Sequence, residues 1–545
     1  MKIQNATKQK KQAQKILKKT TLLLFLSATV FIFSCTKKSK VDYDLDISET
    51  LRWHVATEPP SLDWTIATDT TSSHITGLLM EGLTRHGFKA AEVTTEPNLA
   101  MSWESSKDMK TWTFSLRQDV KWTDGVAFTA QQIIDGWERL LNPKTGAEYA
   151  NFLFNVKNAR AYLEGNIKDF KQVGVSINDK GQLIVALEAA QSYFPSILAH
   201  HSTFPIRKDL IEKYAGKWTE PGNHVGLGAY KLKIWDHDKA VVLERNENYF
   251  GKKPKIKYVL GRIITELSTA LNMFKIGDLD VVDDFPSPEV RMLRDTKEYR
   301  LFSILAVYYL GLNVKRPPLD NVKVRRALSM AIDREEINNI LEKEKIPAYN
   351  IVPPGLLGHD ANIGLKFEPE TAKKILDDAG YQDRSKFPRL QFGFNSSENH
   401  QRIAENIQAQ LKRNLGLGVE LVNEEWKTYL KSLQANTYQM FRMAWVGDYP
   451  DADTFIGLMV TDGGNNRTQW GNKRYDELVK LGVSESDKEK RKQIYFEAQR
   501  ILNEQEVPII PIYYYRAHRL VNARIKNYPQ NVMDKFDLDD TEIIK

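Results

Sequence analysis

An acidic turn beside a tryptophan is the part of this sequence whose residue types are best suited to chemistry. Asp448 directly follows the strand-like stretch Met443-Ala444-Trp445-Val446 and lies in a turn with Gly447, Tyr449 and Pro450. A carboxylate among aromatic side chains suits the binding of a small cation, such as the α-ammonium group of a peptide. The same residues also fit a strand that simply ends in an acidic turn, because Asp, Gly and Pro end strands for local reasons.

Familiar patterns of catalytic residues are missing from the sequence. It has no Gly-x-Ser-x-Gly, no His-Glu-x-x-His and no Walker loop. The adjacent pair His200-His201 disfavours a metal site, because neighbouring side chains diverge on a strand or a helix. Asp448, Asp451 and Asp453 lack the later glutamate and the glycine-centred loop of calcium sites. We therefore expect a binding protein without metal, ATP or another cofactor, and a hydrolase is the remote alternative.

The first 34 residues are typical of a secretion signal. They carry seven lysines and no acidic residue, and they end in an uncharged run from Thr20 to Ser34. As a helix this run would span about 22 Å at ~1.5 Å per residue, which is shorter than the ~30 Å hydrocarbon core of a membrane. Cys35 follows Ile32-Phe33-Ser34, a stretch that resembles a bacterial lipobox. We expect cleavage and lipidation at Cys35; a chance cysteine after an ordinary signal peptide is the alternative.

Without this leader the chain has no net charge. Residues 35–545 contain 70 Lys and Arg and 70 Asp and Glu. This balance, and the lack of a basic tract with interleaved aromatic residues, argues against nucleic acid or an anionic surface as a partner. Cys35 is the only cysteine, so the body has no disulfide and depends on packing for its stability. A chain of this length can build more than one core.

Strand-like and helical patterns alternate from Leu51 to the end of the chain. The predicted strands are 111–117, 182–187, 240–244, 301–313 and 508–516, and the predicted helices are 130–141, 322–343, 370–379, 397–415 and 488–506. This mixture predicts an α/β or α+β protein of at least two lobes. No long linker divides the body, which indicates lobes joined by several crossings of the chain, as in a hinged protein.

Many short strings in one order resemble the oligopeptide-binding proteins of bacterial ABC peptide importers, which are extracellular solute-binding proteins of family 5. They extend from about Leu51 to the C-terminus and include Glu81-Gly82-Leu83, 112–117, 120–125, 137–140, 228–232, 322–328, 347–349, 424–428 and 507–515. The resemblance implies a receptor whose two lobes close on an extended short peptide. Strand edges would bind the peptide's main chain, and hydrated pockets would accept its side chains.

The family resemblance also implies an architecture. The expected fold is α/β, the two-lobed periplasmic-binding-protein-like fold (type II, cluster C), with an additional domain inserted in the first lobe. We expect a signal peptide over 1–34, a tether over 35–50, lobe I from 51–75, 196–305 and 516–545, an extra domain II over 76–195, and lobe III over 306–515.

By the same resemblance, site residues can be assigned. Asp448 would pair with the ligand's α-ammonium group, Trp445 and Tyr449 would wall that pocket, and the backbone just after Glu58 would line the ligand from the other lobe. Tyr149 matches a ligand-contacting tyrosine, with a core aromatic residue as the alternative. His400 and Arg442 would receive the ligand's carboxylate; a surface histidine and an arginine paired with a neighbouring acid are the alternatives.

One departure from the family pattern leaves the ligand open. Leu433-Gln434 stands where the family commonly has an Arg-His pair, which puts carboxylate recognition and peptide length in doubt. A dipeptide receptor, a murein-peptide receptor, a nickel or haem carrier, and a peptide sensor without transport are alternatives on the same fold. The expected partners are short peptides, ABC permease subunits and, through a lipid on Cys35, a bacterial membrane. We expect an exported monomer at the cell envelope.

Overall fold

The computed structural model describes residues 40–89 and 92–544, and these belong to two units, one that ends at Glu49 and one that begins at Thr50. In the first unit, β1 (Lys40–Val41) and β2 (Leu45–Asp46) form a short antiparallel hairpin. The predicted leader and Cys35 lie outside the described residues. Within the described residues, the longest apolar helices fall short of what a membrane crossing requires.

An eleven-stranded sheet dominates the second unit. Its order is β10-β11-β12-β3-β13-β19-β14-β18-β16-β17, and β15 pairs with β19. The strands are β3 (Thr50–Val55), β10 (Tyr230–Asp236), β11 (Ala240–Arg245), β12 (Tyr258–Ile263), β13 (Val281–Val282), β14 (Tyr299–Leu312), β15 (Ile346–Pro347), β16 (Leu390–Asn395), β17 (Val419–Glu424), β18 (Met440–Val446) and β19 (Ile509–Val521).

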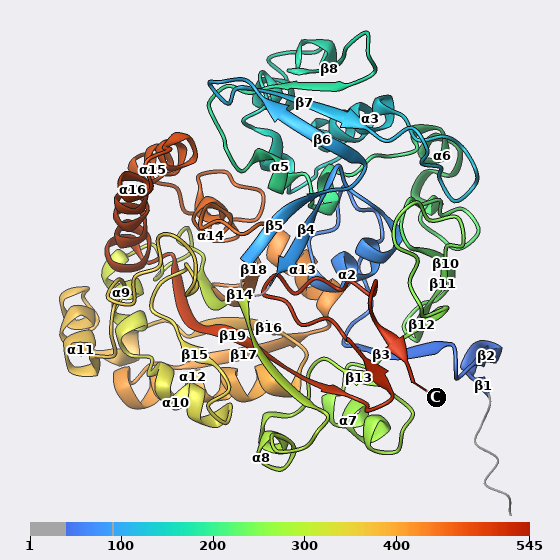
Figure 1. Cartoon of the computed structure of the whole chain (residues 1–545). Helices are drawn as coiled ribbons and strands as arrows, with labels where there is room; N and C mark the ends of the chain where they lie inside the picture. The colour runs from blue at the N-terminus through green and yellow to red at the C-terminus, as the bar shows by residue number, and fades with distance from the viewer. Residues whose placement is uncertain (1–39, 90–91, 545) are drawn as a thin grey trace, which may run out of the picture. The chain divides into compact units, whose positions relative to one another are not determined.

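The two longest strands, β14 and β19, occupy the middle of this sheet and run antiparallel side by side (Figure 1). Successive side chains of β14 point to opposite faces, so Val307 and Tyr309 enter one buried cluster while Tyr308 and Leu310 enter another. Burial on both faces explains why the predicted strand 301–313 is almost continuously apolar. The chain thus passes between the two halves of the sheet along β14 and returns along β19.

Smaller sheets lie outside this core. Residues predicted for domain II form the hairpin of β4 (Thr84–Lys89) and β5 (Glu92–Pro97) and a four-stranded sheet, drawn at the top of Figure 1, of order β6-β7-β9-β8. The four strands are β6 (Ala100–Ser105), β7 (Thr111–Leu116), β8 (Val175–Ile177) and β9 (Leu183–Ala186). Near the C-terminus, β20 (Ile525–Lys526) pairs with β21 (Glu542–Ile543).

Helices cover these sheets. In the N-terminal half they are α2 (Thr70–Leu79), α3 (Ala130–Leu141), α4 (Ala159–Leu163), α5 (Phe194–Ile197), α6 (Lys208–Tyr214), α7 (Leu267–Lys275) and α8 (Val290–Leu293). In the C-terminal half they are α9 (Val322–Met330), α10 (Arg334–Ile340), α11 (Pro369–Asp378), α12 (Glu398–Leu415), α13 (Trp426–Gln434), α14 (Asp453–Ile456), α15 (Lys473–Ser484) and α16 (Lys488–Arg500).

Two predicted helices differ from the structure at their ends or in the middle. The range 322–343 is two helices, because Asp333 caps the start of α10 by accepting hydrogen bonds from the backbone N–H groups of Glu335 and Glu336. The range 488–506 is α16 followed by a π-helical turn, Ile501–Glu506. The other predicted strands and helices listed above match described elements to within about two residues, except the predicted strand 508–516, which extends to Val521 as β19.

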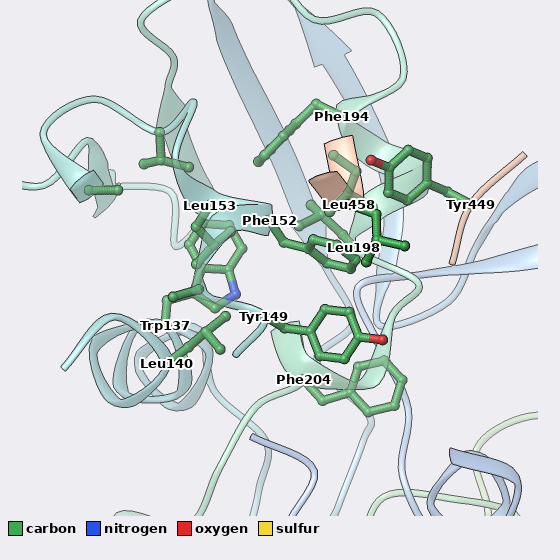
Figure 2. Close-up of a cluster of buried hydrophobic side chains, with 14 of the residues drawn as sticks. Trp137, Leu140, Tyr149, Phe152, Leu153, Phe194, Leu198, Phe204, Tyr449 and Leu458 are labelled. Carbon is green, nitrogen blue, oxygen red and sulfur yellow. The ribbon is translucent and has the colours of Figure 1, made fainter. Parts of the chain in front are cut away.

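A buried aromatic cluster joins the N-terminal and C-terminal halves. Figure 2 shows Tyr449 beside Phe152 and Phe194, which belong to the range predicted for domain II. The ring centroids of Phe152 and Tyr449 lie 5.8 Å apart, and Tyr193 stacks on Tyr449 at 5.6 Å. Side chains from sequence segments about 300 residues apart therefore pack against each other beside the acidic turn that follows β18.

Candidate functional site

A cavity of about 390 Å³ runs along β18. Every residue from Arg442 to Asp448 lines it, and the facing wall includes Thr57, Tyr149 and His200 from the N-terminal half. The volume lies in the usual range for small-ligand sites, which is about 300–1,000 Å³. The cavity therefore lies between two halves of the chain.

Asp448 lies at one end of β18 and is bonded from both sides of the cavity. Its Oδ2 accepts a hydrogen bond from the Thr454 hydroxyl at 3.1 Å, and its Oδ1 accepts one from the Tyr149 hydroxyl at 3.4 Å. The Nε2 atom of His200 lies 3.3 Å from Oδ1. Tyr149 lies at the start of a 3-10 turn over 150–153 and His200 at the start of another over 201–203, so two short turns aim their side chains at one carboxylate.

His200 is neutral here. Its Nδ1 accepts a hydrogen bond from the backbone N–H of Ser202 at 3.3 Å, so the ring proton is on Nε2, which faces Asp448. Burial lowers the pKa of His200 well below its usual value of 6.5. Asp448 thus receives hydrogen bonds at this end without a histidine cation.

The Asp448 carboxyl is harder to ionise than an ordinary aspartate. Burial raises its pKa to about 6, although the charge of Lys535 and the hydrogen bond from Thr454 act in the opposite direction. A carboxylate that is buried without a tightly paired cation gains more from an incoming ammonium group than one in water does. This end of the cavity can therefore bind a cation.

Arg442 lies six residues before Asp448 and holds a buried positive charge among neutral groups. It donates from Nη1 to Asn395 Oδ1 at 3.0 Å and from Nη2 to the Tyr515 hydroxyl at 3.1 Å, and it lies 4.9 Å from the Tyr308 ring centroid. Within the described residues no Asp or Glu forms an ion pair with it. The alternative of an arginine paired with a neighbouring acid is therefore not what the structure shows.

Two further basic side chains lie in the same part of the cavity. His400 is in the first turn of α12, and burial lowers its pKa well below 6.5, so the ring is neutral at pH 7. Its Nδ1 has no hydrogen-bond partner among the described residues. Lys345 donates from Nζ to the carbonyl oxygen of Arg516 at 2.8 Å. Together with Arg442, these groups can bind an anion such as a carboxylate.

The structure does not bring every sequence-assigned residue to the cavity. Trp445, Tyr149, His400, Arg442 and Asp448 line it.

Tyr449 and Glu58 are absent from the described lining of this cavity. Tyr449 is 4% exposed and donates to Asp453 Oδ2 at 2.9 Å, behind the wall. The Glu58 carboxylate accepts hydrogen bonds from Trp235 Nε1 and the Asp238 N–H, so it faces the β10–β11 turn. Ala56 and Thr57, which directly precede Glu58, do line the cavity.

The expectation that His200 and His201 diverge is wrong. Their ring centroids lie 4.0 Å apart, because the pair enters a 3-10 turn and not a strand or a regular helix. His201 Nε2 hydrogen-bonds to the carbonyl oxygen of Ala67 at 3.0 Å, and burial lowers its pKa well below 6.5. In the described part of the chain, no cluster of three or more His, Cys, Asp or Glu has a metal-binding arrangement.

Sequence reasoning missed several polar side chains of this cavity. His200, Lys345, Asn395 and Arg467 line it from different elements. None lies in a motif that marks it in the sequence; only the fold brings these side chains to β18.

Comparison with known proteins identifies the family. Residues 94–467 match the model of the bacterial extracellular solute-binding proteins, family 5 Middle. The chain is 34% identical over 483 residues to the oligopeptide-binding protein OppA of Bacillus subtilis, covering 86% of this chain and 87% of the relative. It is 32% identical over 492 residues to the dipeptide-binding protein DppE of the same organism, covering 88% and 89%.

Solved structures confirm the fold that the sequence predicts. The oligopeptide-binding protein OppAIV of Borrelia burgdorferi aligns with a TM-score of 0.86 at 33% identity, over 91% of this chain and all of that chain. The murein tripeptide binding protein MppA of Escherichia coli aligns with a TM-score of 0.86 at 32% identity, over 92% and 99%.

The unliganded open form of MppA scores 0.63 over 92% of this chain and 98% of that chain, which is lower than the TM-score of 0.86 for the other MppA structure. The cluster C fold and the family prediction are confirmed. The chain belongs to the bacterial extracellular solute-binding proteins of family 5, which are binding proteins and not enzymes.

Proposed function

We propose that this protein captures short oligopeptides outside the cytoplasm and delivers them to an ABC permease. The observation that carries the proposal is the separation of two buried charges along one cavity-lining segment: Arg442 lies within β18, Asp448 lies two residues after it, and neither has a tightly paired opposite charge among the described residues. A peptide with free termini carries an ammonium group and a carboxylate that are separated in the same way. Relatives named for oligopeptides, dipeptides and murein peptides agree with a peptide ligand.

The exposed edge of β18 supports main-chain recognition. The strand pairs with β14 along its whole length, but its recorded partners on β16 end at Gly393↔Phe441. From Arg442 onward β18 faces the cavity, where a peptide can add as a further strand. With its amine at Asp448 and its carboxylate toward Arg442, the peptide would run antiparallel to β18.

The spacing of the two charges favours oligopeptides over dipeptides. Six residues of extended chain separate Arg442 from Asp448, which is about 20 Å at ~3.3 Å per residue. The long arginine side chain shortens this distance, and a peptide of three to five residues would fill it. Recovery of dipeptides or of a murein peptide from the purified protein, identified by mass spectrometry, would instead move the function to those alternatives.

The terminal assignments can be tested by matching each variant to a modified ligand. We expect Asp448→Asn to weaken the binding of a tripeptide with free termini by about 10- to 100-fold. This corresponds to the loss of ~1.5–3 kcal/mol for a hydrogen bond between charged groups. N-acetylation of the peptide should cause a similar loss in the parent and little further loss in the variant. In the same way, Arg442→Met and amidation of the peptide's C-terminus should each weaken binding, and amidation should cause little further loss in the Arg442→Met variant. All affinities are measured by calorimetry.

Asp179→Asn, a change of an exposed aspartate in the N-terminal half, is the matched control and should bind all ligands as the parent does. Equal binding of the free peptide by parent and Asp448→Asn would show that the amine assignment is wrong. If acetylation and amidation each have no effect on the parent, the ligand is not a peptide read through its termini.

Peptide affinity should depend on pH through Asp448. Its pKa of about 6 in the empty site means that protonation competes with the ligand's ammonium below pH 6. Affinity should therefore rise up to tenfold per pH unit from pH 5 to 6 and level off near pH 7. Above about pH 8 it should fall again, because the free α-amine, with a pKa of ~7.7–8, loses its proton.

The groups facing Asp448 do not obscure this profile. His200 and His201 stay neutral because burial lowers their pKa values well below 6.5. Lys535 has a pKa that burial lowers from 10.5 and Asp448 raises. Calorimetry from pH 5 to 9 with an N-acetylated peptide should show an affinity that does not change near pH 6. If free and acetylated peptides show the same dependence of affinity on pH, Asp448 is not the source of that dependence.

Hinge closure is the proposed mechanism of capture. β14 and β19 connect the lobes, and their pairing is irregular between Ser303↔Arg516 and Val307↔Tyr514. Three residues of β14 there oppose one residue of β19, which gives the strands a place to bend. Peptide bonded to both lobes would stabilise the closed form through its differential affinity, and the loaded form would dock on the permease.

A contact between the ranges predicted for domain II and lobe III supports this mechanism. Glu148, in the range predicted for domain II, accepts a hydrogen bond from Gln434 Nε2 at 2.9 Å and forms an ion pair with Arg467. Gln434 and Arg467 both belong to the range predicted for lobe III. Gln434 is also the residue that departs from the family's Arg-His pair, so in this chain that position holds the lobes together. We call these three residues the clasp.

Loss of the clasp should weaken the binding of all peptides by the same factor. We expect Glu148→Gln to cost about 1 kcal/mol, or roughly fivefold in Kd, for each of several unrelated peptides, because both side chains are largely shielded from water. Small-angle scattering should show a larger ligand-free radius of gyration than the parent has. Glu104→Gln, an exposed change in the same range, is the control. Weakening of one peptide alone would make Arg467 a ligand contact and not part of a clasp.

We further propose that a lipid on Cys35 anchors the protein to a bacterial membrane, because an exported chain has little other use for a single cysteine. Cys35→Ser should release the protein from the membrane fraction of cells, and mass spectrometry of the parent's mature N-terminal peptide should find an acylated cysteine. A parent protein with an unmodified Cys35 would remove this part of the proposal.

A further inference from the structure

A single lysine projects into the ligand cavity from a rigid turn after β19. Asn531 fixes the backbone of Lys535 twice: its Oδ1 accepts from the Lys535 N–H at 2.9 Å and its Nδ2 donates to the Lys535 carbonyl oxygen at 2.8 Å. The preceding residue, Asp534, is held by an ion pair with Arg519 and by a hydrogen bond between its carbonyl oxygen and His74 at 2.8 Å. The turn therefore fixes the backbone from which the Lys535 side chain extends.

The Lys535 side chain faces open space on two sides. It lines the main cavity and also a neighbouring chamber of about 120 Å³. Its ammonium group forms no hydrogen bond or ion pair with the residues that the structure describes. Burial lowers its pKa, while the charges of Asp448 and Asp534 raise it. It is thus a cation near the amine site that lacks an anion of its own.

Neither nearby carboxylate is available as that anion. Asp534 is engaged by Arg519 and His74. Asp448 is bonded by Thr454 and Tyr149 and is the proposed partner of the ligand's amine. A bound ammonium group would also repel Lys535 unless the ligand brought a negative charge with it.

We propose that Lys535 is a specificity-determining residue that receives an anionic side chain carried by the first or second residue of the ligand. The inference rests on the proposed function, because Asp448 must hold the α-amine for Lys535 to lie beside the ligand's N-terminus. A third residue would lie about 7 Å farther along an extended chain, at ~3.3 Å per residue, and its side chain would leave this region. Aspartate or glutamate at the head of the peptide is the chemistry that fits.

Isosteric peptide pairs test this assignment. Calorimetry of the parent should show Glu-Ala-Ala or Ala-Glu-Ala binding about tenfold more tightly than Gln-Ala-Ala or Ala-Gln-Ala, respectively. Lys535→Met should remove the preference, and Lys535→Arg should retain it. Ala-Ala-Glu and Ala-Ala-Gln should show no dependence on Lys535, because the third residue lies beyond its reach.

The controls separate this proposal from the assignment of the amine site. Asp448→Asn should weaken every peptide and leave the Glu/Gln ratio in place, and an unchanged melting temperature of Lys535→Met would show that the fold is intact. A parent without a Glu/Gln difference at either position would overturn the proposal. A Glu/Gln difference in affinity that persists in Lys535→Met would also overturn it. The same would follow if Lys535→Met changed the affinity for all peptides equally. Failure of the amine assignment would appear separately, as insensitivity of the parent to N-acetylation.

Discussion

Burial of a carboxylate that lacks a tightly paired cation is the constraint on which this binding site depends. Asp448 lies just after β18, and its hydrogen-bond donors come from both halves of the chain: Thr454 from its own side and Tyr149 from the facing wall, where His200 also lies 3.3 Å away. Closure therefore removes water from Asp448 and replaces it with neutral donors. Burial of a charge costs free energy unless the charge is paired, so a closed and empty site is unfavourable at this point.

That cost links ligand binding to closure. An ammonium group supplies the missing charge, and the closed arrangement then becomes favourable at Asp448. Arg442 is the corresponding buried cation, since its guanidinium is bonded to the neutral groups of Asn395 and Tyr515. A ligand with a single charge would lower the cost of charge burial at Asp448 or at Arg442, but not at both. In the proposed mechanism the lobes move about β14 and β19, whose irregular pairing near Ser303 would give these strands a place to bend.

The sequence predicted the parts of this arrangement that depend on local pattern. Trp445, in β18, and Asp448, in the turn after it, have residue types that indicate a cation site, and the apolar run 301–313 indicates the buried strand β14. The break at Asp333 was missed, because an N-cap inside a helical pattern is a weak signal. The backbone just after Glu58 was predicted to line the ligand, but Ala56 and Thr57 line the cavity instead, and the Glu58 carboxylate bonds Trp235, a partner that the sequence cannot place.

Side chains that meet only through tertiary structure could not be predicted at all. His200 and Asp448 are separated by nearly half of the chain, and the 3-10 turn that brings the two histidine rings together has no signature in His200-His201. The contacts of the clasp could not be predicted from the sequence either. Gln434 looks like the loss of a recognition residue when it is compared with the family pattern, yet it donates to Glu148 across the cavity. In the proposed function, a position where the family resemblance implies a recognition residue would serve lobe closure in this chain, because both tasks need a donor that faces a carboxylate.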